Sequence, residues 1–308
     1  MIAVLAGGVG AARLLRGLVQ VVDPADVIVV ANTGDDLVLH GLHISPDLDT
    51  ITYTLAEAGN PETGWGLAGE TWQAMDALDR YGGPSWFRLG DRDLGTHLFR
   101  TGRLSEGAGL AGVTAEIAAA WELGFRLLPA TEDHLRTMVT LADGGEVGFQ
   151  EYFVGLRHDV PVSGIRFDGA DDALPGPGVL EAITTAEAVV VAPSNPLVSI
   201  APILAVPGVR DAVAARRGSA VAVSPIVGGS ALKGPADRML AEMGHESSVV
   251  GVARLYRDLV ATLVIDRVDA DLADEVEAEG VRCVVTDTVM RTTDVAAALA
   301  KTAIEAVA

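Results

Sequence analysis

The chain has 308 residues, a formal net charge of −20 and one cysteine, Cys283. Its length allows one large or two modest domains with a substantial core. The negative charge argues against nucleic acid and anionic membranes as partners, because either needs a basic face. A single cysteine excludes an intramolecular disulfide framework and a Cys-rich zinc or iron–sulfur site. Cys283 lies in an apolar run that predicts a buried strand and an inert thiol.

The apolar runs of the chain are short, although hydrophobic residues make up 49% of it. The longest runs, at 27–31 and 188–192, have the length of strands and fall far below the roughly 20 residues of a membrane span. The N-terminus has no basic segment and leads directly into glycines, so we expect a first strand rather than a signal peptide. These features predict a cytoplasmic protein.

The first 35 residues predict a βαβ unit. Residues 2–5 are apolar, a glycine turn follows at 7–10, residues 11–22 have leucines at helical spacing, and residues 27–31 are fully apolar. Fully apolar strands indicate a parallel sheet that is covered on both faces. The fold class predicted is therefore α/β, a Rossmann-like, doubly wound and mainly parallel sheet.

The middle of the chain changes character before the doubly wound pattern returns. Helical periodicity dominates residues 61–121, and residues 127–167 contain alternating segments, such as 148–154, that predict antiparallel strands. Later strands are expected at 188–191, 220–223, 263–265 and 281–285, between helices near 209–216, 236–243, 272–279 and 294–307. We therefore predict a core of residues 1–60 and 185–308 with a helical cap and β insertion at 61–184.

The glycine turn after the first strand is a candidate phosphate site. Gly7, Gly8 and Gly10 precede a helix, where backbone N–H groups and the helix dipole attract anions. The spacing lacks the last glycine of the dinucleotide fingerprint, which lowers the chance of a dinucleotide cofactor. A plain tight turn is the alternative.

Two acidic loops follow the second strand. Asp35 and Asp36 come directly after it, and Asp47 and Asp49 come one short segment later. Asp47 or Asp49 alone would be an ordinary cap of a helix at 51–58, but four carboxylates in two converging loops exceed what capping needs. Oxygen ligands without cysteine suit Mg²⁺, which takes one or two carboxylates plus substrate phosphates and waters. We therefore favour Asp35, Asp36, Asp47 and Asp49 as candidate metal ligands.

Further polar loops follow other predicted strands. A strand expected at 85–89 leads into Asp91 and Arg92, where Arg92, or Arg88 before it, could grip a phosphate or carboxylate. A salt-bridged surface arginine is the alternative. The loops at 192–196 and 224–229, with Lys233 beyond, suit nucleotide contacts, although ordinary turns are equally expected there.

The ordered set of these loops resembles the 2-phospho-L-lactate transferase family, which acts in biosynthesis of the deazaflavin coenzyme F-420. No single motif is decisive, but the set spans nearly the whole chain in order. The motifs that carry the resemblance are LAGGVG at 5–10, NTGDD at 32–36, SPDLDT at 45–50, LGDRD at 89–93, LLPAT at 127–131, APSNP at 192–196 and SPIVGG at 224–229.

The resemblance implies a Mg²⁺-dependent transfer. The donor would be a three-carbon acid, phosphoenolpyruvyl or 2-phospho-L-lactyl, activated by guanosine diphosphate; the acceptor would be the ribityl hydroxyl of the deazaflavin precursor Fo, and GMP would leave. The sequence looks most like actinobacterial members, for which phosphoenolpyruvyl is implied, and the family is commonly dimeric, so a homodimer is expected.

The resemblance also assigns roles to single residues. Asp49 matches the family aspartate tied to deazaflavin binding, and either Arg88 or Arg92 matches the basic position on the acceptor side. We expect Asp49 and Arg92 to act in catalysis. The loops at 192–196 and 224–229 match the guanine nucleotide side, whereas Lys233 stands where relatives vary. Together with the loop assignments above, the predicted substrate-binding positions are Gly7, Gly8, Gly10, Asn32, Asp49, Arg88, Asp91, Ser194, Asn195, Pro196, Ser224, Gly228 and Lys233.

Two other functions are weighed against the transferase. A sugar-nucleotide-binding regulator would share the glycine-rich start and the sheet, but such proteins lack the SPDLDT and GDRD motifs. An NAD-dependent oxidoreductase is suggested only by the first glycine turn, and Asn32 stands where an acid would hold the ribose. Both features favour the enzyme predicted above.

Overall fold

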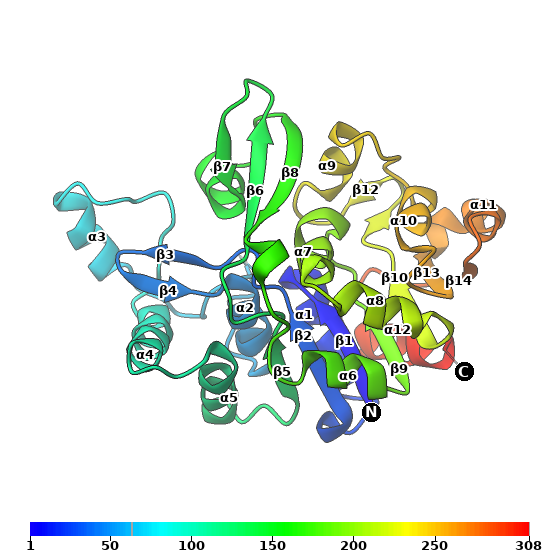
Figure 1. The fold of residues 1–308 in the computed structure, drawn as a ribbon, viewed down its shortest axis with the longest axis horizontal. Helices are drawn as coiled ribbons and strands as arrows, with labels where there is room; N and C mark the ends of the chain where they lie inside the picture. The colour runs from blue at the N-terminus through cyan, green and yellow to red at the C-terminus, as the bar shows by residue number, and fades with distance from the viewer. Residues whose placement is uncertain (63, 308) are drawn as a thin grey trace.

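The computed structural model describes residues 1–62 and 64–307, which form a seven-stranded parallel sheet with helices on both faces (Figure 1). The strand order is β14-β13-β10-β9-β1-β2-β5, and every pairing in it is parallel. This confirms the predicted doubly wound α/β fold. The strands are β1 (Ile2–Ala6), β2 (Val27–Ala31), β5 (Arg126–Pro129), β9 (Ala188–Val191), β10 (Ala220–Val223), β13 (Thr262–Asp266) and β14 (Arg282–Thr286).

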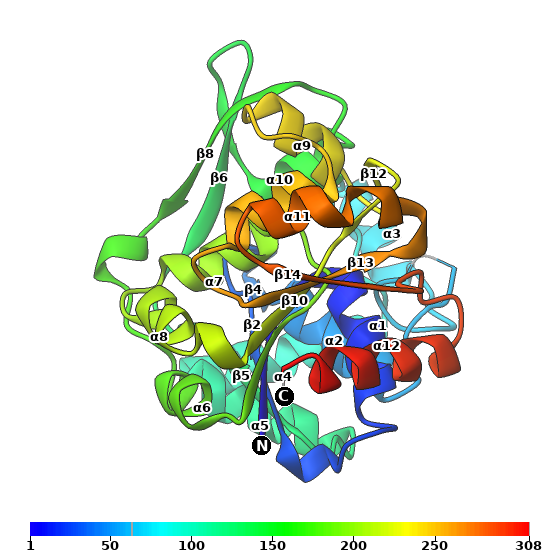
Figure 2. The same cartoon turned by 90° about the vertical axis from the view of Figure 1, so that its right-hand side faces the viewer.

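The apolar strands are buried because helices cover both sides of the sheet. Ala3 and Leu5 of β1 point into one core, and Ile2 and Val4 point into the other, as the alternation of side chains along a strand requires. Figure 2 shows the two layers of helices. One layer contains α1 (Gly8–Leu18), α2 (Pro46–Leu55) and α12 (Thr293–Glu305), and the other contains α6 (Val179–Thr185), α7 (Ala201–Ala205), α8 (Val209–Ala215), α10 (Val249–Tyr256) and α11 (Ala273–Ala278).

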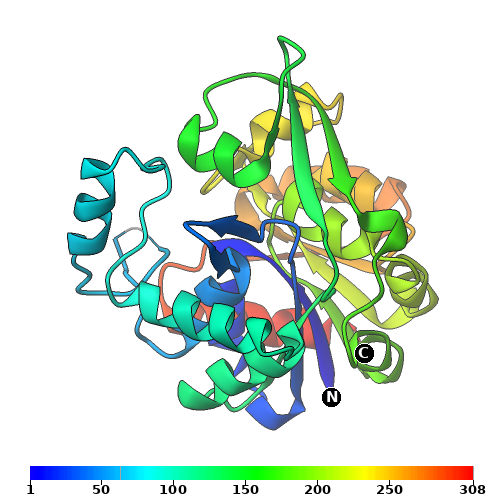
Figure 3. The ribbon, with the colours of Figure 1, turned by 60° about the vertical axis from the view of Figure 1, so that its left-hand side comes forward.

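A helical lobe extends from the edge of the sheet beside β2 and β5 (Figure 3). It consists of α3 (Gln73–Arg80), α4 (Asp93–Ser105), α5 (Leu110–Ala120) and the hairpin of β3 (Leu37–Leu39) with β4 (Leu42–Ile44). The hairpin packs with α3 and α4 around a small core that includes Leu39, Ile44 and Met75. The helical character predicted for this part of the chain is confirmed.

A second sheet stands above the carboxyl ends of the central strands (Figure 1). Its antiparallel order is β7-β6-β8, with β6 (Arg136–Leu141), β7 (Glu146–Gly148) and β8 (Val162–Asp168). The predicted antiparallel excursion is thus present. Beside it lie a two-stranded ribbon of β11 (Ile226–Val227) and β12 (Ser230–Ala231), and helix α9 (Ala236–Glu242).

Several local predictions were wrong. Residues 85–89 form no strand, and most of 148–154 is a π-helical turn, Glu151–Gly155, whose aromatic residues pack on that second sheet. The helix expected at 51–58 begins earlier, at Pro46. Cys283 is only half-buried because β14 is an edge strand; burial still raises the pKa of its thiol to about 11.

The predicted division into core and insertion differs from the sheet in one respect. Strand β5 falls within residues 61–184, yet it pairs with β2 and closes one edge of the central sheet. All but the last residue of helix α6 also fall within that range, and this helix packs in the main core. The rest of the division stays a prediction.

No single helix among the described residues is long and apolar enough to cross a membrane. One pair of helices, Pro196–Ala205 and Val209–Ala215, is long and apolar enough when the two are taken together, but they are bent by 98° relative to each other. Its apolar side chains, such as Ile203 and Val213, are buried in the core of this protein.

Candidate active site

The glycine turn after β1 is tied to the loop after β9, its neighbour in the sheet. The backbone N–H of Gly7 donates to Ser194 Oγ at 3.2 Å, and the Ser194 hydroxyl donates to the Gly7 carbonyl at 2.7 Å. A Cβ on Gly10 would lie 2.2 Å from the Pro193 carbonyl oxygen. Only glycine therefore allows these two loops to approach so closely.

Asp47 links this turn to the loop after β2. Its Oδ1 accepts the Gly8 N–H at 2.7 Å, and its Oδ2 accepts the Asn32 side-chain amide at 2.9 Å. The Asn32 Oδ1 in turn accepts the Gly34 N–H at 2.8 Å. Burial raises the pKa of Asp47 to about 6. The N–H groups of Gly7 and Gly8 are therefore engaged within the protein, and Asp47 holds three loops together at the carboxyl ends of β1 and β2.

Asp35 and Asp36 are the acids with unused oxygens. Oδ1 of each is buried and has no hydrogen-bond partner among the described residues, whereas Asp36 Oδ2 accepts the Ser45 hydroxyl at 2.7 Å. Burial, and for Asp35 also the charge of Asp47, raises the pKa of both carboxyl groups well above the ordinary value. Both residues line a small pocket with Gly34, Leu37, Trp86, Arg136, Phe149, Gln150 and Glu151.

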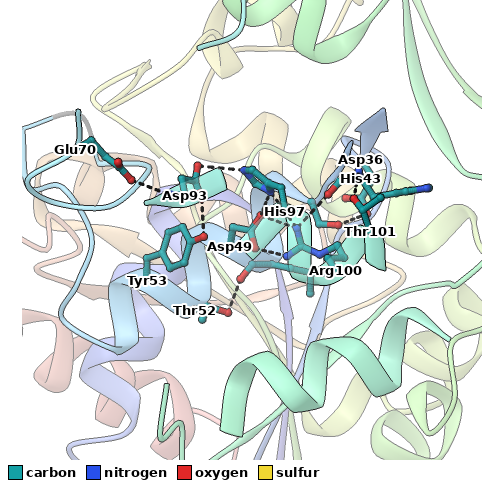
Figure 4. Close-up of polar contacts among 12 residues, drawn as sticks. Asp36, His43, Asp49, Thr52, Tyr53, Glu70, Asp93, His97, Arg100 and Thr101 are labelled. Atoms are coloured by element: carbon teal, nitrogen blue, oxygen red, sulfur yellow. Dashed lines mark hydrogen bonds and ion pairs between the residues drawn. The ribbon is translucent and has the colours of Figure 1, made fainter. Parts of the chain in front are cut away.

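Asp49 is held by Arg100, a residue that the sequence analysis did not single out (Figure 4). The two guanidinium nitrogens of Arg100 donate to the two oxygens of Asp49, with Nη1 at 3.1 Å from Oδ2. Arg100 is 1% exposed and Asp49 is 5% exposed. A buried and bidentate pair of this kind fixes the direction of the carboxylate as well as its charge.

The pair extends into a buried network along one face of α4. His97 Nδ1 lies 3.7 Å from Asp49 Oδ2, and His97 Nε2 lies 3.2 Å from Asp93 Oδ2. The Tyr53 hydroxyl donates to Asp93 Oδ1 at 2.5 Å. Burial would raise the pKa of Asp93, but its contacts with His97, Tyr53 and Arg100 outweigh burial and lower it. Burial and the nearby Asp49 and Asp93 raise the pKa of Tyr53, so its hydroxyl stays a donor.

A signal for this network was present in the sequence. Asp93, His97 and Arg100 are separated by four and three residues, which places them on one face of a helix. All three fall within residues 61–121, where helical periodicity was expected, and α4 begins at Asp93. Spacing within the helix does not indicate that it packs beside Asp49, because that contact depends on how the helical lobe folds back on the sheet.

A metal ion fits part of the predicted quartet. Among residues 1–62 and 64–307, no three His, Cys, Asp or Glu side chains are close enough to hold a metal. Asp47 and Asp49 use both oxygens within the protein. Asp35 and Asp36 each keep a free buried oxygen, and Mg²⁺ commonly takes only one or two protein carboxylates with substrate phosphates and waters. These two residues therefore fit such an ion.

The acidic and basic residues of the 88–92 segment are engaged elsewhere. Asp91 accepts the N–H groups of Gln73 and Ala74 at the start of α3, both at 3.0 Å. Arg92 Nη1 donates to the Ala68 carbonyl at 2.5 Å. Arg88 pairs with Asp76 at 2.5 Å and lies over the Trp72 ring. Because residues 85–89 form no strand, this segment is not at the edge of the sheet, and its role toward substrate stays a prediction.

The later loops reach the same end of the sheet. Asn195 caps the helical turn that begins at Pro196, since its Oδ1 accepts the Leu197 N–H at 2.9 Å. Ser224 closes a turn with Ile226. The Gly228 N–H donates to both oxygens of Asp269, at 3.1 and 3.0 Å. The nucleotide-binding roles assigned to Asn195, Pro196, Ser224 and Gly228 stay predictions.

The Lys233 ammonium group lies in the neighbourhood of the glycine turn. A Cβ built on Gly64 would lie 2.9 Å from Lys233 Nζ and 3.4 Å from Val9 Cγ1. The ammonium group is therefore near Val9, the residue between Gly8 and Gly10. This location is compatible with the predicted contact to a phosphate, which stays a prediction.

Fold and site together define an α/β protein with a buried acidic centre at the carboxyl ends of a parallel sheet, where ligands bind in such folds. The model of the family described as 2-phospho-L-lactate transferase CofD matches residues 2–304. The chain belongs to this family and is thus a transferase of coenzyme F420 biosynthesis.

Named relatives agree with the family. The chain is 48% identical to a phosphoenolpyruvate transferase of Streptomyces griseus over 309 residues, covering 99% of this chain and 97% of the relative. It is 46% identical to a phosphoenolpyruvate transferase of Streptomyces coelicolor, with 98% and 97% covered. A crystal structure of protein BH3568 from Bacillus halodurans has a TM-score of 0.65 at 20% identity, covers 99% of this chain and 98% of that one, and shows a shared fold.

Proposed function

We propose that the chain transfers a phosphoenolpyruvyl group from a guanosine-diphosphate-activated donor to the ribityl hydroxyl of the deazaflavin precursor Fo, releasing GMP. The name phosphoenolpyruvate transferase, carried by the relatives, supports this choice of group; the family description keeps 2-phospho-L-lactyl as the alternative. The structural observation that carries the proposal is a buried oxygen on each of Asp35 and Asp36 that has no hydrogen-bond partner in the part of the chain the structure describes.

The proposed reaction is a displacement at phosphorus. The ribityl oxygen forms a bond to the phosphorus that carries the three-carbon acid, and the bond from that phosphorus to the oxygen of GMP breaks. Mg²⁺ held by Asp35 and Asp36 would neutralise the diphosphate oxygens. The protein's own part is to hold the hydroxyl in line with the leaving group and to accept its proton.

Asp49 is the residue proposed to orient the ribityl hydroxyl and accept its proton. Both oxygens of this carboxylate accept from Arg100 in this structure, so this role requires the pair to open. Arg92, which we propose to stabilise developing charge, donates to the Ala68 carbonyl here, so this role requires its side chain to move. Cytoplasmic location and a homodimer belong to the same proposal.

The test is incubation with Fo, Mg²⁺ and each guanylylated donor, followed by mass analysis of the products. We expect GMP and dehydro-F-420-0 from the phosphoenolpyruvyl donor, and loss of turnover when Mg²⁺ is chelated. No GMP release with either donor would rule the transferase out and leave a nucleotide-binding regulator. An Asp49→Asn variant that binds both substrates and turns over normally would remove Asp49 from the mechanism.

A further inference from the structure

Arg136, at the start of β6, is a cation in the acidic pocket without a partner in the described part of the chain. Its side chain lines the pocket together with Asp35 and Asp36, and it forms no hydrogen bond or ion pair with any residue of 1–62 or 64–307. The other arginines around the site are already engaged: Arg88 with Asp76, Arg92 with the Ala68 carbonyl and Arg100 with Asp49.

On the neighbouring strand, the carboxylate nearest in register to Arg136 is already paired with other residues. Asp168 of β8 lies directly across from Arg136 in the sheet. Its carboxylate is nevertheless taken by Arg166, at 2.5 Å, and approached by His134 at 3.4 Å. Arg166 also pairs with Glu146 at 2.7 Å. One arginine of this small sheet is thus neutralised by two carboxylates, while the arginine facing the pocket is left with none.

Gly148 makes room for the Arg136 guanidinium. A Cβ on Gly148 would lie 2.4 Å from Arg136 Nη2 and 2.9 Å from Cζ. Gly148 is the last residue of β7, and its partner across the ladder is Met138, two residues beyond Arg136. The guanidinium therefore lies close against bare backbone at the mouth of the pocket, in a position that any larger residue at 148 would disturb.

We propose that Arg136 binds an oxyanion of the substrate, either the carboxylate of the three-carbon acid or a phosphate of the donor. This rests on the proposed function. A protein with a net charge of −20 repels an anionic donor, and the planar fork of an arginine matches a carboxylate or phosphate with two parallel hydrogen bonds. Both three-carbon acids carry this carboxylate, so if the carboxylate is the ligand, Arg136 would favour either donor over GDP without choosing between the acids.

The experiment measures equilibrium binding of GDP and of the phosphoenolpyruvyl-guanosine-diphosphate donor to wild type and variants by calorimetry. In Arg136→Ala we expect affinity for the donor to fall roughly tenfold to a hundredfold, the range for losing hydrogen bonds to a charged group. If the carboxylate is the ligand, GDP affinity is unchanged; if a phosphate is the ligand, both affinities fall.

Gly148→Ala provides a variant that keeps every charge. Its new Cβ meets only the flexible end of Arg136, so the strand should keep its fold while the guanidinium is displaced. We expect donor affinity to fall here as well, by less than in Arg136→Ala. Arg166→Ala, which removes an arginine from the next strand outside the pocket, is the matched control and should leave both affinities unchanged.

The outcomes separate this inference from the proposed function. If Arg136→Ala and Gly148→Ala both bind the donor as tightly as wild type does, the proposed role of Arg136 is wrong, whichever group the enzyme transfers. Equal losses in Arg136→Ala and Arg166→Ala would overturn it too, because a general charge effect would then explain the result. A wild-type protein that binds the donor but releases no GMP would instead count against the proposed reaction and leave the binding result standing.

Discussion

At the scale of single residues, the four aspartates have different surroundings and therefore different expected roles. Asp35 and Asp36 keep free oxygens, Asp47 holds loops together, and Asp49 is locked by Arg100. Sequence spacing alone cannot make this distinction, because all four occupy similar positions after the same strand. The partner that sets Asp49 apart, Arg100 on α4, comes from a distant part of the chain.

Removal of Arg100 should destabilise the protein strongly. In Arg100→Met the Asp49 carboxylate stays buried without its partner, and we expect a loss of about 3–5 kcal/mol in the free energy of unfolding. The matched control is Arg103→Met on the same helix, because Arg103 is partly exposed and pairs with Glu106 and Glu116 at the surface; its free energy of unfolding should change little. Urea unfolding measures both.

A double variant refines this test. Asp49→Asn combined with Arg100→Met leaves no unpaired charge, so it should be more stable than Arg100→Met alone. If the two arginine variants lose the same stability, or if the double variant is the least stable, the buried ion pair is not what holds α4 against α2.

The raised pKa of Asp47 predicts a pH dependence of stability in the absence of divalent ions. The carboxyl has a pKa of about 6 in the folded protein and 3.8 as its reference value, so between these values the folded state binds a proton that the unfolded chain releases. Protonation of Asp47 therefore stabilises the folded protein by roughly 3 kcal/mol below about pH 4, and this stabilisation is lost as pH rises through about 6.

The measurement is urea unfolding in chelator, from about pH 5 to about pH 7. Asp47→Asn should flatten the fall in stability, whereas Asp274→Asn, which changes an exposed acid on α11, should not. Mg²⁺ should also reduce the fall if Asp35 and Asp36 bind it, because a cation beside the cluster favours the charged carboxylates. Stability that rises with pH across this range would contradict the assignment.

At the scale of elements, the loops of neighbouring strands fit together through contacts that tolerate no side chain. Gly10→Ala puts a Cβ 2.2 Å from the Pro193 carbonyl oxygen, a rigid backbone atom, so we expect a loss of roughly 1–3 kcal/mol from overpacking. Gly102→Ala, within α4 and facing open space, is the control and should stabilise the protein by about 0.5–1 kcal/mol. Thermal unfolding compares them; equal effects would contradict the close approach.

Elements with strong local patterns could be predicted, and those that depend on distant contacts could not. The apolar runs of β1, β2, β9 and β10 identified the parallel sheet, because strands covered on both faces need no polar alternation. The segment 85–89 has the composition of a strand, but Leu89 and Trp86 pack against the β3–β4 hairpin and α3 instead. At 148–154 the aromatic residues pack around a helical turn, which an alternating pattern does not distinguish from a strand.

At the scale of the whole molecule, the central sheet determines which loops meet. Strands β9, β1 and β2 are adjacent, so the loops that begin at Pro193, Gly7 and Asn32 converge. Gly7 and Ser194 are in contact although they lie 187 residues apart in the sequence. The helical lobe then adds Arg100 and His97 beside Asp49, and the small sheet adds Arg136 above Asp35. The site therefore combines the central sheet, the helical lobe and the small antiparallel sheet. Of these, only the central sheet could be predicted from the hydrophobic periodicity of the sequence.

This arrangement predicts which nucleotide stabilises the folded protein. A ligand that binds only the folded state at about one hundred times its Kd adds roughly 2.7 kcal/mol to the free energy of unfolding, a shift of several degrees in Tm for a chain of this size. We expect that shift with GDP and none with NAD, because Asn32 donates to Asp47 where an oxidoreductase would present an acid to the ribose. Thermal shift measurements with both nucleotides, with and without Mg²⁺, test this. A Tm shift with NAD and none with GDP would favour the oxidoreductase, since the protein would then bind the dinucleotide and not the guanosine nucleotide of the proposed donor.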